Sequence, residues 1–588
     1  MDSPGRRRSS ARKTIVTGLI AAAVLALGIA ASIRVQRDAL AKHDPATGIA
    51  VLPFATIGRS EGQVVADGMT AEITNRLASL HSLRVVGRGS ARDYRNSGKT
   101  PQQIARELGV KYLVTGTVRW DKSADGKILV RVSPALLQGE DASPMWAEAY
   151  QSMLGGVFDV QSRVAAEVVH ALNLSLLAPE RIALRRKPTD DLAAYALYAR
   201  ARQIVDDSFE VAAMREAVGL LQRATKRDPE FTAAWALLAI AYTELYWNST
   251  DKSSELLALA RSALGKAAAI DSDDPDVHLA RGIYLYHGER NYVRAMAELD
   301  AVERARPSDP GASLYKGAIN RHQRRLEEAV RDFKRAVALD PRNGRDMLEV
   351  ANTLYRLERY GEAEIYVDRG MALAPREPLG PILKSRLAID ARGNVPEAVE
   401  HLRNAAHNVQ PASSMIVVLQ SETWPAVEDS GLRQLLTDAH PTIDASTGSI
   451  HAAKASLFRY LGDLTRARVY ADSAALAINA QLQRTGETQD LYDRLAFVAA
   501  IMGRQAEASR AMARADALLP ESVDAWTAMD RANARPGLFA ILGDSDAAID
   551  ALEKRVAQPG GISANRVRLD PVYASLRADA RFQALIRR

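Results

Sequence analysis

The chain has 588 residues, more than one hydrophobic core can hold, so the sequence predicts several domains or a repeat array. Only 6% of the residues are aromatic, and alanine is abundant, which favours packed helices over sheets. The net charge of +6 is concentrated in part at the N-terminus, which argues against nucleic-acid binding by the whole chain. The absence of cysteine excludes disulfides, thiolate zinc sites and cysteine catalysis.

An uncharged run covers residues 14–33. Twenty residues of α-helix rise about 30 Å, enough to cross a bilayer core. Basic residues cluster before the run, so the positive-inside rule places the tail 1–13 in the cytoplasm and the bulk of the chain in the periplasm or another extracytoplasmic space. We therefore predict a single-pass inner-membrane helix over 14–33. Small residues at 28–32 leave a cleaved signal peptide as an alternative, and a buried soluble helix is a third interpretation.

Residues 49–178 follow a short polar linker and predict an α/β domain with mixed strand order. Strands are expected at 49–54, 83–86, 112–120 and 128–137, with a possible further strand at 146–150. Helices are expected from the N-cap Asp67 to residue 80, from Pro101 to Leu108, and over 157–177. Gly109 ends the second helix, and residues 123–126 form a hairpin turn.

Several motifs of this region resemble the TolB-like amino-terminal domain. They are IAVLPF at 49–54, ADGMTAEI at 66–73, LRVVGRGS at 83–90, IARELGVKYLVTGTVR at 104–119, MWAEAY at 145–150 and FDVQSRVAAEV at 158–168. In such proteins the domain commonly lies between a transmembrane helix and tetratricopeptide repeats. An adenylate cyclase, a serine/threonine kinase or a winged-helix regulator often precedes the membrane helix, but thirteen residues cannot hold such an effector. The resemblance implies a fold and an architecture, and no catalytic residue.

Two consecutive segments in the middle of the chain share residue types at the same offsets. Gly317 is followed by Ala329, Phe333, Ala336 and Pro341, and Ala351 is followed by Ala363, Val367, Gly370 and Pro375. The two prolines lie 34 residues apart, which is the tetratricopeptide period. Small residues allow two antiparallel helices to approach closely, and the proline ends the second helix. Such a unit needs neighbours to bury its apolar face.

The pattern extends in both directions and predicts an all-α solenoid of about eight or nine repeats. We expect repeats over 190–408, an irregular helical segment over 409–444, further repeats over 445–560 and a C-terminal cap over 566–588. The unit at 277–306 carries one inserted residue between its helices. The solenoid is expected to form a right-handed superhelix whose concave surface binds a protein or peptide partner.

Five side chains on the first helices of the repeats are candidates for partner binding. Lys316 and Asn320 lie one helical turn apart and could grip a carboxylate, although Lys316 is beside the position that a carboxylate clamp normally uses. Tyr284, Tyr315 and Tyr355 belong to a group of tyrosines that offer large contact area with little rotamer entropy. Packing between repeats is the alternative role for these tyrosines. The arginine-rich turn at 321–325 is predicted to be a solvated loop.

No motif for catalysis or for a cofactor is complete. Gly87 and Gly89 could begin a dinucleotide fingerprint, but Arg92 stands where the third glycine is needed. The histidines lack metal-site spacing, and neither a phosphate loop nor a nucleophile elbow is present. The sequence therefore predicts no catalytic residue, no metal site and no cofactor. It favours a non-enzymatic membrane-anchored scaffold or sensor. The alternative is a regulatory subunit whose effector (a cyclase, kinase or transcription regulator) is a separate chain.

Overall fold

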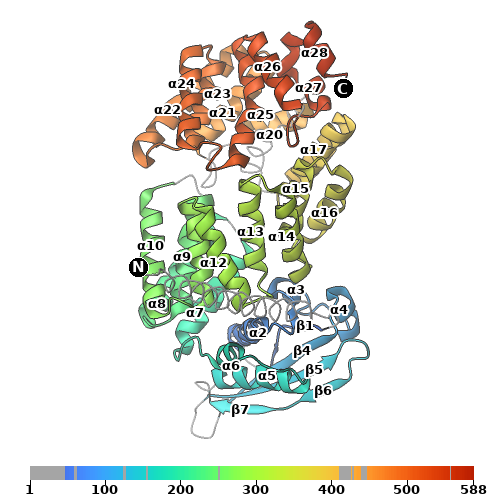
Figure 1. Ribbon diagram of the computed structural model, residues 1–588, viewed down its shortest axis with the longest axis vertical. Coiled ribbons are helices and arrows are strands. Elements are labelled where there is room, and N and C mark those ends of the chain that lie inside the picture. The colour runs from blue at the N-terminus through green and yellow to red at the C-terminus, as the bar shows by residue number, and fades with distance from the viewer. Residues whose placement is uncertain are drawn as a thin grey trace, which may run out of the picture.

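The computed structural model describes residues 47–587, except 58–61, 123–127, 154–156, 209, 249–251, 409–424, 427–428, 439–445 and 557. The predicted tail, the membrane helix over 14–33 and the hairpin turn over 123–126 lie outside the described residues. Within the described part of the chain, no helix has the length and apolar character that crossing a membrane requires. An α/β region, a first block of helices and a second block follow one another along the long axis (Figure 1).

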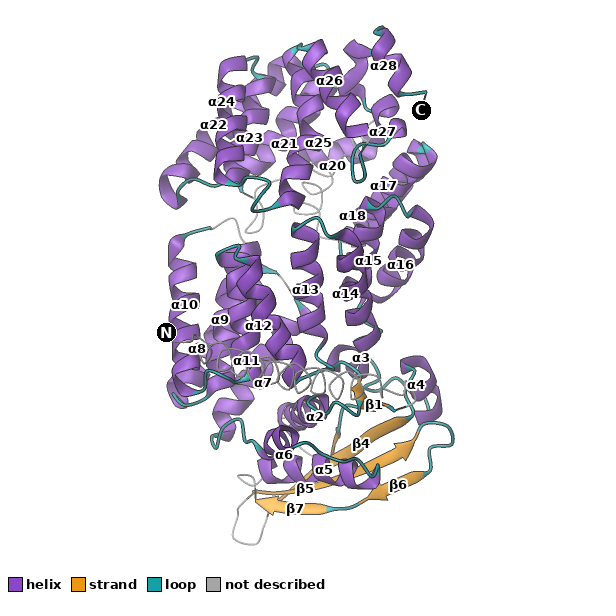
Figure 2. Ribbon diagram, viewed as in Figure 1, coloured by secondary structure: helices purple, strands orange, loops and turns teal. Residues whose placement is uncertain are grey.

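The α/β region contains a mixed seven-stranded sheet (Figure 2). Its strands are β1 (Gly48–Val51), β2 (Ala55–Ile57), β3 (Arg84–Val85), β4 (Tyr112–Lys122), β5 (Ile128–Gln138), β6 (Pro144–Ala147) and β7 (Tyr150–Met153). The order is β3-β1-β4-β5-β6, with β2 beside β4 and β7 beside β5. Strand β1 runs parallel to β3 and β4, whereas β5 is antiparallel to β4, β6 and β7. The mixed strand order is as predicted.

Helices cover both faces of this sheet. They are α2 (Gly62–Ala78), α3 (Arg88–Arg92), α4 (Pro101–Leu108), α5 (Val157–Ala171) and α6 (Ala178–Arg185). Alternation along β1 sends Ile49 and Val51 into the core under α2 and α5, while Ala50 and Leu52 enter the core under α4. The predicted α4 is confirmed, with a Thr100 capping box and Gly109 at φ 63°.

Two sequence predictions in this region are wrong. Helix α2 begins at Gly62, so Asp67 lies inside the helix and is not its N-cap. Its carboxylate instead accepts a hydrogen bond from Gln63 Nε2 at 2.8 Å. The long helix expected over 157–177 ends at Ala171, because Asn173 adopts φ 51°, and α6 follows as a separate helix.

The rest of the chain is a long all-α array of antiparallel helix pairs. The first block holds α7 (Leu192–Asp207), α8 (Val211–Arg227), α9 (Thr232–Asn248), α10 (Ser254–Ile270), α11 (Pro275–Ile283), the π-helical turn η2 (Tyr284–Gly288), α12 (Tyr292–Ala305), α13 (Pro310–His322), α14 (Leu326–Leu339), α15 (Gly344–Arg356), α16 (Tyr360–Leu373), α17 (Leu379–Arg392) and α18 (Val395–Asn408). The second block holds α20 (Ser430–Asp438), α21 (Thr447–Tyr460), α22 (Leu464–Thr485), α23 (Gln489–Ile501), α24 (Gln505–Leu518), α25 (Ala525–Leu542), α26 (Ser545–Val556), α27 (Ala564–Leu569), η4 (Pro571–Leu576) and α28 (Ala580–Leu585).

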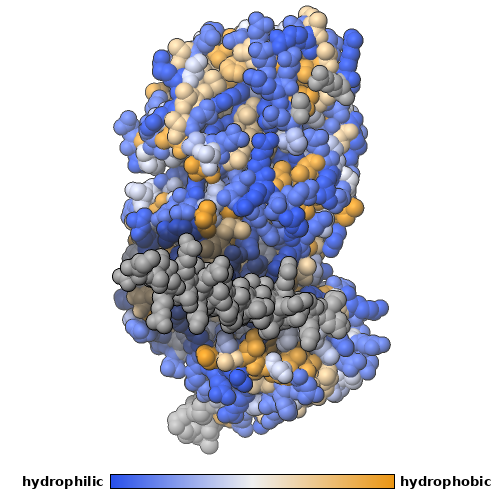
Figure 3. Space-filling model, in the orientation of Figure 1, coloured by the Kyte–Doolittle hydropathy of each residue, from blue (hydrophilic) through white to orange (hydrophobic). Residues whose placement is uncertain are grey.

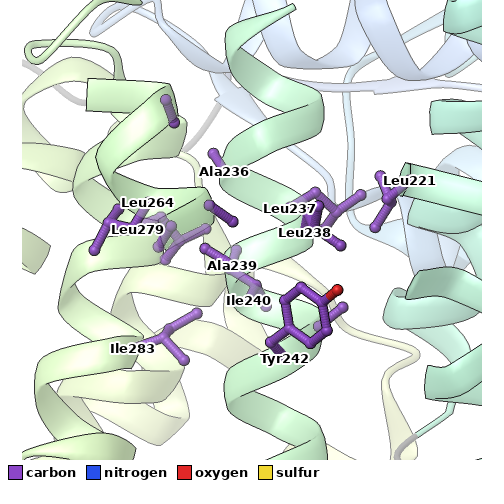
Figure 4. Packing of buried hydrophobic residues seen from close by; sticks show 14 of the residues in the cluster. Leu221, Ala236, Leu237, Leu238, Ala239, Ile240, Tyr242, Leu264, Leu279 and Ile283 are labelled. Atoms are coloured by element: carbon purple, nitrogen blue, oxygen red, sulfur yellow. The ribbon is translucent and has the colours of Figure 1, made fainter. Parts of the chain in front are cut away.

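Small residues set the distance between paired helices, as the repeat offsets predict. A Cβ atom on Gly317 of α13 would lie 2.8 Å from the Phe333 ring of α14. One on Gly370 of α16 would lie 2.8 Å from Leu348 of α15. A continuous apolar core then joins successive pairs, as Figure 4 shows where Leu237 and Leu238 of α9 approach Leu221 of α8. The shared core holds neighbouring pairs of the first block together.

Candidate protein-binding surface

The five predicted partner-binding side chains all have partners within the chain. Lys316 Nζ lies 2.7 Å from both Asp300 and Glu303 of α12, whereas Asn320 Nδ2 donates to Asp332 of α14 at 2.6 Å. The two candidates for a carboxylate clamp therefore contact opposite neighbouring helices and are not brought together. Partner binding at these residues stays a prediction.

The three tyrosines are engaged in packing between repeats. Tyr284 and Tyr355 are buried, and Tyr315 is half-buried. The Tyr284 hydroxyl accepts from Arg261 Nε at 2.9 Å, and the Tyr315 hydroxyl donates to Glu244 of α9 at 2.9 Å. The Tyr355 hydroxyl donates to Asp390 of α17. These contacts favour the packing role over a free recognition surface.

The inserted residue of the unit at 277–306 is absorbed by the π-helical turn η2. From the N-cap of the first helix to the left-handed residue of the following turn, this unit runs from Asp274 to Arg290, one residue more than Asp309 to Arg324 in the next unit. A π turn holds one extra residue inside a helix and often marks a functional site. The π turn includes Tyr286 and His287, whose rings contact those of Trp247 and Tyr315.

The rings of Tyr286 and His287 belong to a group of six side chains in mutual contact, which we call the inner aromatic cluster. Its members are Trp247, Tyr286, His287, Tyr292, Tyr315 and His322. The rings of Trp247 and His287 are stacked at 4.2 Å with an interplanar angle of 6°. Lys252 Nζ lies 5.4 Å from the Trp247 ring centroid, and burial lowers the pKa of Lys252 to about 8. The cluster combines aromatic faces with histidine nitrogens, and the Lys252 ammonium group lies beside it.

One carboxylate of the second block reaches into this cluster. Asp524, the N-cap of α25, is fully buried and accepts hydrogen bonds from His322 Nδ1 at 2.9 Å, Arg290 Nη1 at 2.7 Å and the Tyr292 hydroxyl at 3.2 Å. Burial alone would raise the pKa of Asp524, but the bond from His322 and the Arg290 charge lower it to about 2. Asp524 is therefore a fixed negative charge between the two blocks.

The prediction of a solvated turn at 321–325 is wrong for its first residues. His322 is 7% exposed and bonded to Asp524. The Arg321 guanidinium pairs with Glu349 and lies 5.1 Å from the Trp526 ring centroid. The start of the turn is covered because the second block packs on His322, a contact between residues about 200 positions apart that local sequence does not encode.

The α/β region is attached to the first block by a second buried carboxylate. Asp340, at the end of α14, accepts from the Ser90 backbone N–H at 2.8 Å and from the Ser90 hydroxyl. A Cβ atom on Gly87 or Gly89 would lie 2.6 or 2.7 Å from the Asp340 side chain. These glycines, which the sequence excluded as a dinucleotide fingerprint, thus accommodate a carboxylate of the chain itself. Burial raises the pKa of Asp340, and the bonds from Ser90 oppose that rise.

Sequence reasoning missed the residues that join the parts of the molecule, Asp340, Asp524, Asp390 and Arg566. One signal was present: His322, Arg356 and Asp390 occupy equivalent repeat positions, 34 residues apart, and all are polar. In the described residues, no group of three or more His, Asp or Glu side chains is placed to hold a metal ion. The charged groups that join the parts are buried and hydrogen-bonded within the chain.

Comparison with known proteins gives partial matches. No protein-family model matches the chain. Over 245 residues it is 34% identical to a protein of Rhizobium meliloti (strain 1021) named "Putative adenylate cyclase 3". The match covers 40% of this chain and 40% of that protein, so the chain spans well under half of the relative's length. None of the comparisons identifies the α/β region as TolB-like.

Several solved structures are similar to part of this chain. A tetratricopeptide repeat protein from Parabacteroides merdae is 14% identical and covers 52% of this chain and 99% of that chain, with a TM-score of 0.29. PilW, a type IV pilus biogenesis factor, is 21% identical, covers 37% and 94%, and has a TM-score of 0.30. The helical array of this chain is a tetratricopeptide-repeat region. Its own helix pairs and the 34-residue spacing of its proline-terminated units carry that conclusion.

Proposed function

We propose that this chain is a non-enzymatic scaffold or sensor, anchored in the membrane through residues 14–33, that binds a protein partner along its repeat region. One observation carries the proposal: buried hydrogen bonds join the α/β region to the first block of the repeat region, so the repeats are held in a fixed place beside it. Rigid stacks of helix pairs offer extended surfaces for protein recognition. The resemblance to a TolB-like domain belongs to the same proposal and supports an extracytoplasmic location.

The surface of the repeat region offers exposed positions at which a partner can be captured. In the view of Figure 3 this surface is mostly hydrophilic, with small separate apolar patches. Val293 of α12 is 78% exposed and Ile365 of α16 is 59% exposed, and both lie on second helices of repeats. Ile182 of α6 in the α/β region is 71% exposed and serves as a matched apolar position outside the repeats.

Photocrosslinking in cells tests the proposal. A photoreactive amino acid at position 293 or 365 of the full chain, or at other exposed positions of the repeats, is expected to capture the same protein, identified by mass spectrometry. The same photoreactive amino acid at position 182 should capture a different protein or none. Specific adducts at position 182 and none along the repeats would contradict the proposal.

A location test is independent of the partner. Alkaline phosphatase fused after residue 588 should be active in cells, because this enzyme needs an extracytoplasmic environment to form its disulfides. A fusion protein that is stable but inactive would contradict the predicted topology. It would have no bearing on whether the repeats bind a partner.

The partial similarity to a protein that is named an adenylate cyclase favours a second candidate function. In this version the chain is a regulatory subunit of a signalling system whose effector (an adenylate cyclase, a serine/threonine kinase or a transcription regulator) is a separate chain. Removal of the chain from cells should then change the cyclic AMP level, while the purified full chain forms no cyclic AMP from ATP. Turnover of ATP by the purified chain would contradict both candidates.

A further inference from the structure

The two helical blocks have separate hydrophobic cores where α13 meets α25. The buried apolar residues of α13 and α15 belong to the core of the first block, and those of α25 pack with α23, α24, α26 and the C-terminal helices. Among the described residues, no hydrophobic cluster contains members of both α13 and α25. Among the residues that the structure describes, the blocks share an apolar cluster only at the join of α17 and α18 with α20 and α21, with Leu569 beside it. Away from this join, something other than an apolar core holds the blocks together.

Charged and aromatic contacts hold them there. Equivalent positions at the ends of three first helices each contact the second block. Away from the join, His322 bonds to Asp524 and the Arg356 guanidinium lies 2.9 Å from Asp530. Beside the join, Asp390 pairs with Arg566 and accepts from the Ser563 hydroxyl at 2.6 Å.

Trp526 of α25 completes this contact surface. Its ring lies between two guanidinium groups, 5.1 Å from that of Arg321 and 5.3 Å from that of Arg356. Cation–π contacts of this kind hold a partly buried aromatic ring against charged neighbours. We call the contacts of Asp524, Trp526, Asp530 and Arg566 with the first block the polar closure.

The polar closure covers the inner aromatic cluster. Asp524 bonds directly to two cluster members, Tyr292 and His322, and both are less than 10% exposed. Arg290, the third partner of Asp524, lies 5.7 Å from the Trp247 ring centroid. Withdrawal of α25 would therefore remove the groups that cover Tyr292 and His322 and leave this edge of the cluster at the surface.

Interfaces inside a chain that are polar, with separate cores on each side, permit relative motion of the parts. We propose that the second block is a closing element: it pivots about the apolar join at α17–α21, and its withdrawal exposes the inner aromatic cluster as the site for a protein partner. The inference rests on the proposed partner binding, and it adds regulation by an internal competitor. Because α25 offers an acidic N-cap, a tryptophan two residues later and an acid six residues later, a displacing partner would present acidic and aromatic groups.

The closure can be weakened without disturbing helix capping. Asp524→Asn keeps an N-cap residue on α25 and removes the charge that faces Arg290 and His322. Asp390→Asn removes the charge that faces Arg566, and Asp390 lies inside α17, where it caps no helix. Asp309→Asn is the matched control, because Asp309 is also an N-cap, on α13, and its carboxylate bonds only within the first block.

The absence of native cysteine allows two spin labels to be placed without further changes. One label goes on position 293 of α12 and the other on position 476 of α22, which are 78% and 74% exposed and lie in different blocks. Pulsed electron spin resonance on the full chain should give one distance for the starting protein and for D309N. In the D524N/D390N variant, at least a tenth of the molecules should show a longer distance between the two labels. Hydrogen exchange of the backbone amides of residues 284–292 should be at least tenfold faster in this variant.

A crosslinked variant keeps the test decisive if D524N/D390N folds poorly. Arg324 and Glu521 face each other across the closure at 3.8 Å, and both are partly exposed. Cysteines at these two positions, joined by a bifunctional maleimide, should slow exchange of 284–292 relative to the uncrosslinked protein. Unchanged distances and exchange in D524N/D390N, or unchanged exchange after crosslinking, would overturn the closing role. Because no partner is used in these measurements, their failure would leave the proposed function standing.

Discussion

At the scale of single residues, Gln161 is one of the polar side chains whose burial is uncompensated. Gln161 of α5 is 0% exposed, and neither its amide nitrogen nor its carbonyl oxygen has a hydrogen-bond partner. A buried unpaired polar group costs about 1–3 kcal/mol. We expect Gln161→Met, which is close in shape, to raise the free energy of unfolding by about 1 kcal/mol or more in denaturant titration. Gln505→Met, at an exposed position of α24, should change it little, and equal effects would contradict the explanation.

The turns between paired helices carry a second residue-scale feature. Arg290, Arg324 and Glu358 hold positive φ at equivalent turns, where Gly393 and Gly543 also occur. A left-handed conformation costs a non-glycine residue about 1 kcal/mol. Glu358 is exposed, so Glu358→Gly should raise the midpoint of thermal unfolding, whereas Gly543→Ala should lower it. A Cβ on Gly543 would meet no atom within 4 Å, which isolates the backbone effect.

At the scale of elements, the junction between α3 and the end of α14 depends on two glycines. A Cβ atom on Gly89 would lie 2.7 Å from Asp340 Oδ2, so Gly89→Ala should push the carboxylate away from Ser90. We expect loss of protection against hydrogen exchange at residues 86–92 and a fall in stability of about 1–3 kcal/mol. Gly219→Ala on α8 is the control, because a Cβ there meets nothing within 4 Å. Equal behaviour of the two variants would show that Asp340 does not hold this junction.

Elements were predictable where the signal is local. The pairing of Gly317 with Phe333 follows from a repeat period, and Thr100, Pro101 and Gly109 mark the ends of α4 through their own backbone preferences. Contacts between distant segments were not predictable. Asp340 lies 250 residues from Ser90, and Asp524 lies 202 residues from His322, so no spacing rule connects them. The candidate tyrosines fell between these cases, because periodicity placed them on first helices but could not show which neighbour their hydroxyls meet.

At the scale of the whole molecule, two buried carboxylates join three parts. Asp340 attaches the α/β region to the first block, and Asp524 attaches the second block to the first. Burial raises the pKa of Asp340, while donors and positive charges hold that of Asp524 at about 2. The Asp524 carboxylate therefore stays ionised above about pH 4. The response of this junction to mild acid depends instead on His322, which faces it.

His322 should make the contact between the blocks sensitive to pH between 7.5 and 5. Burial lowers the pKa of His322 below its usual 6.5, an effect that Asp524 opposes and that the charges of Arg321 and Arg290 reinforce. A lowered pKa means that the folded chain favours the neutral ring, so this stabilisation is present above pH 6.5 and is lost as pH falls toward the folded pKa, by at most about 1.4 kcal/mol per pH unit. Thermal unfolding of His322→Gln, which keeps a donor that cannot titrate, should fall less steeply with acid than the starting protein. His170→Gln, at an exposed position of α5, should keep the original slope, and a shared slope in all three proteins would exclude His322 as the titrating group.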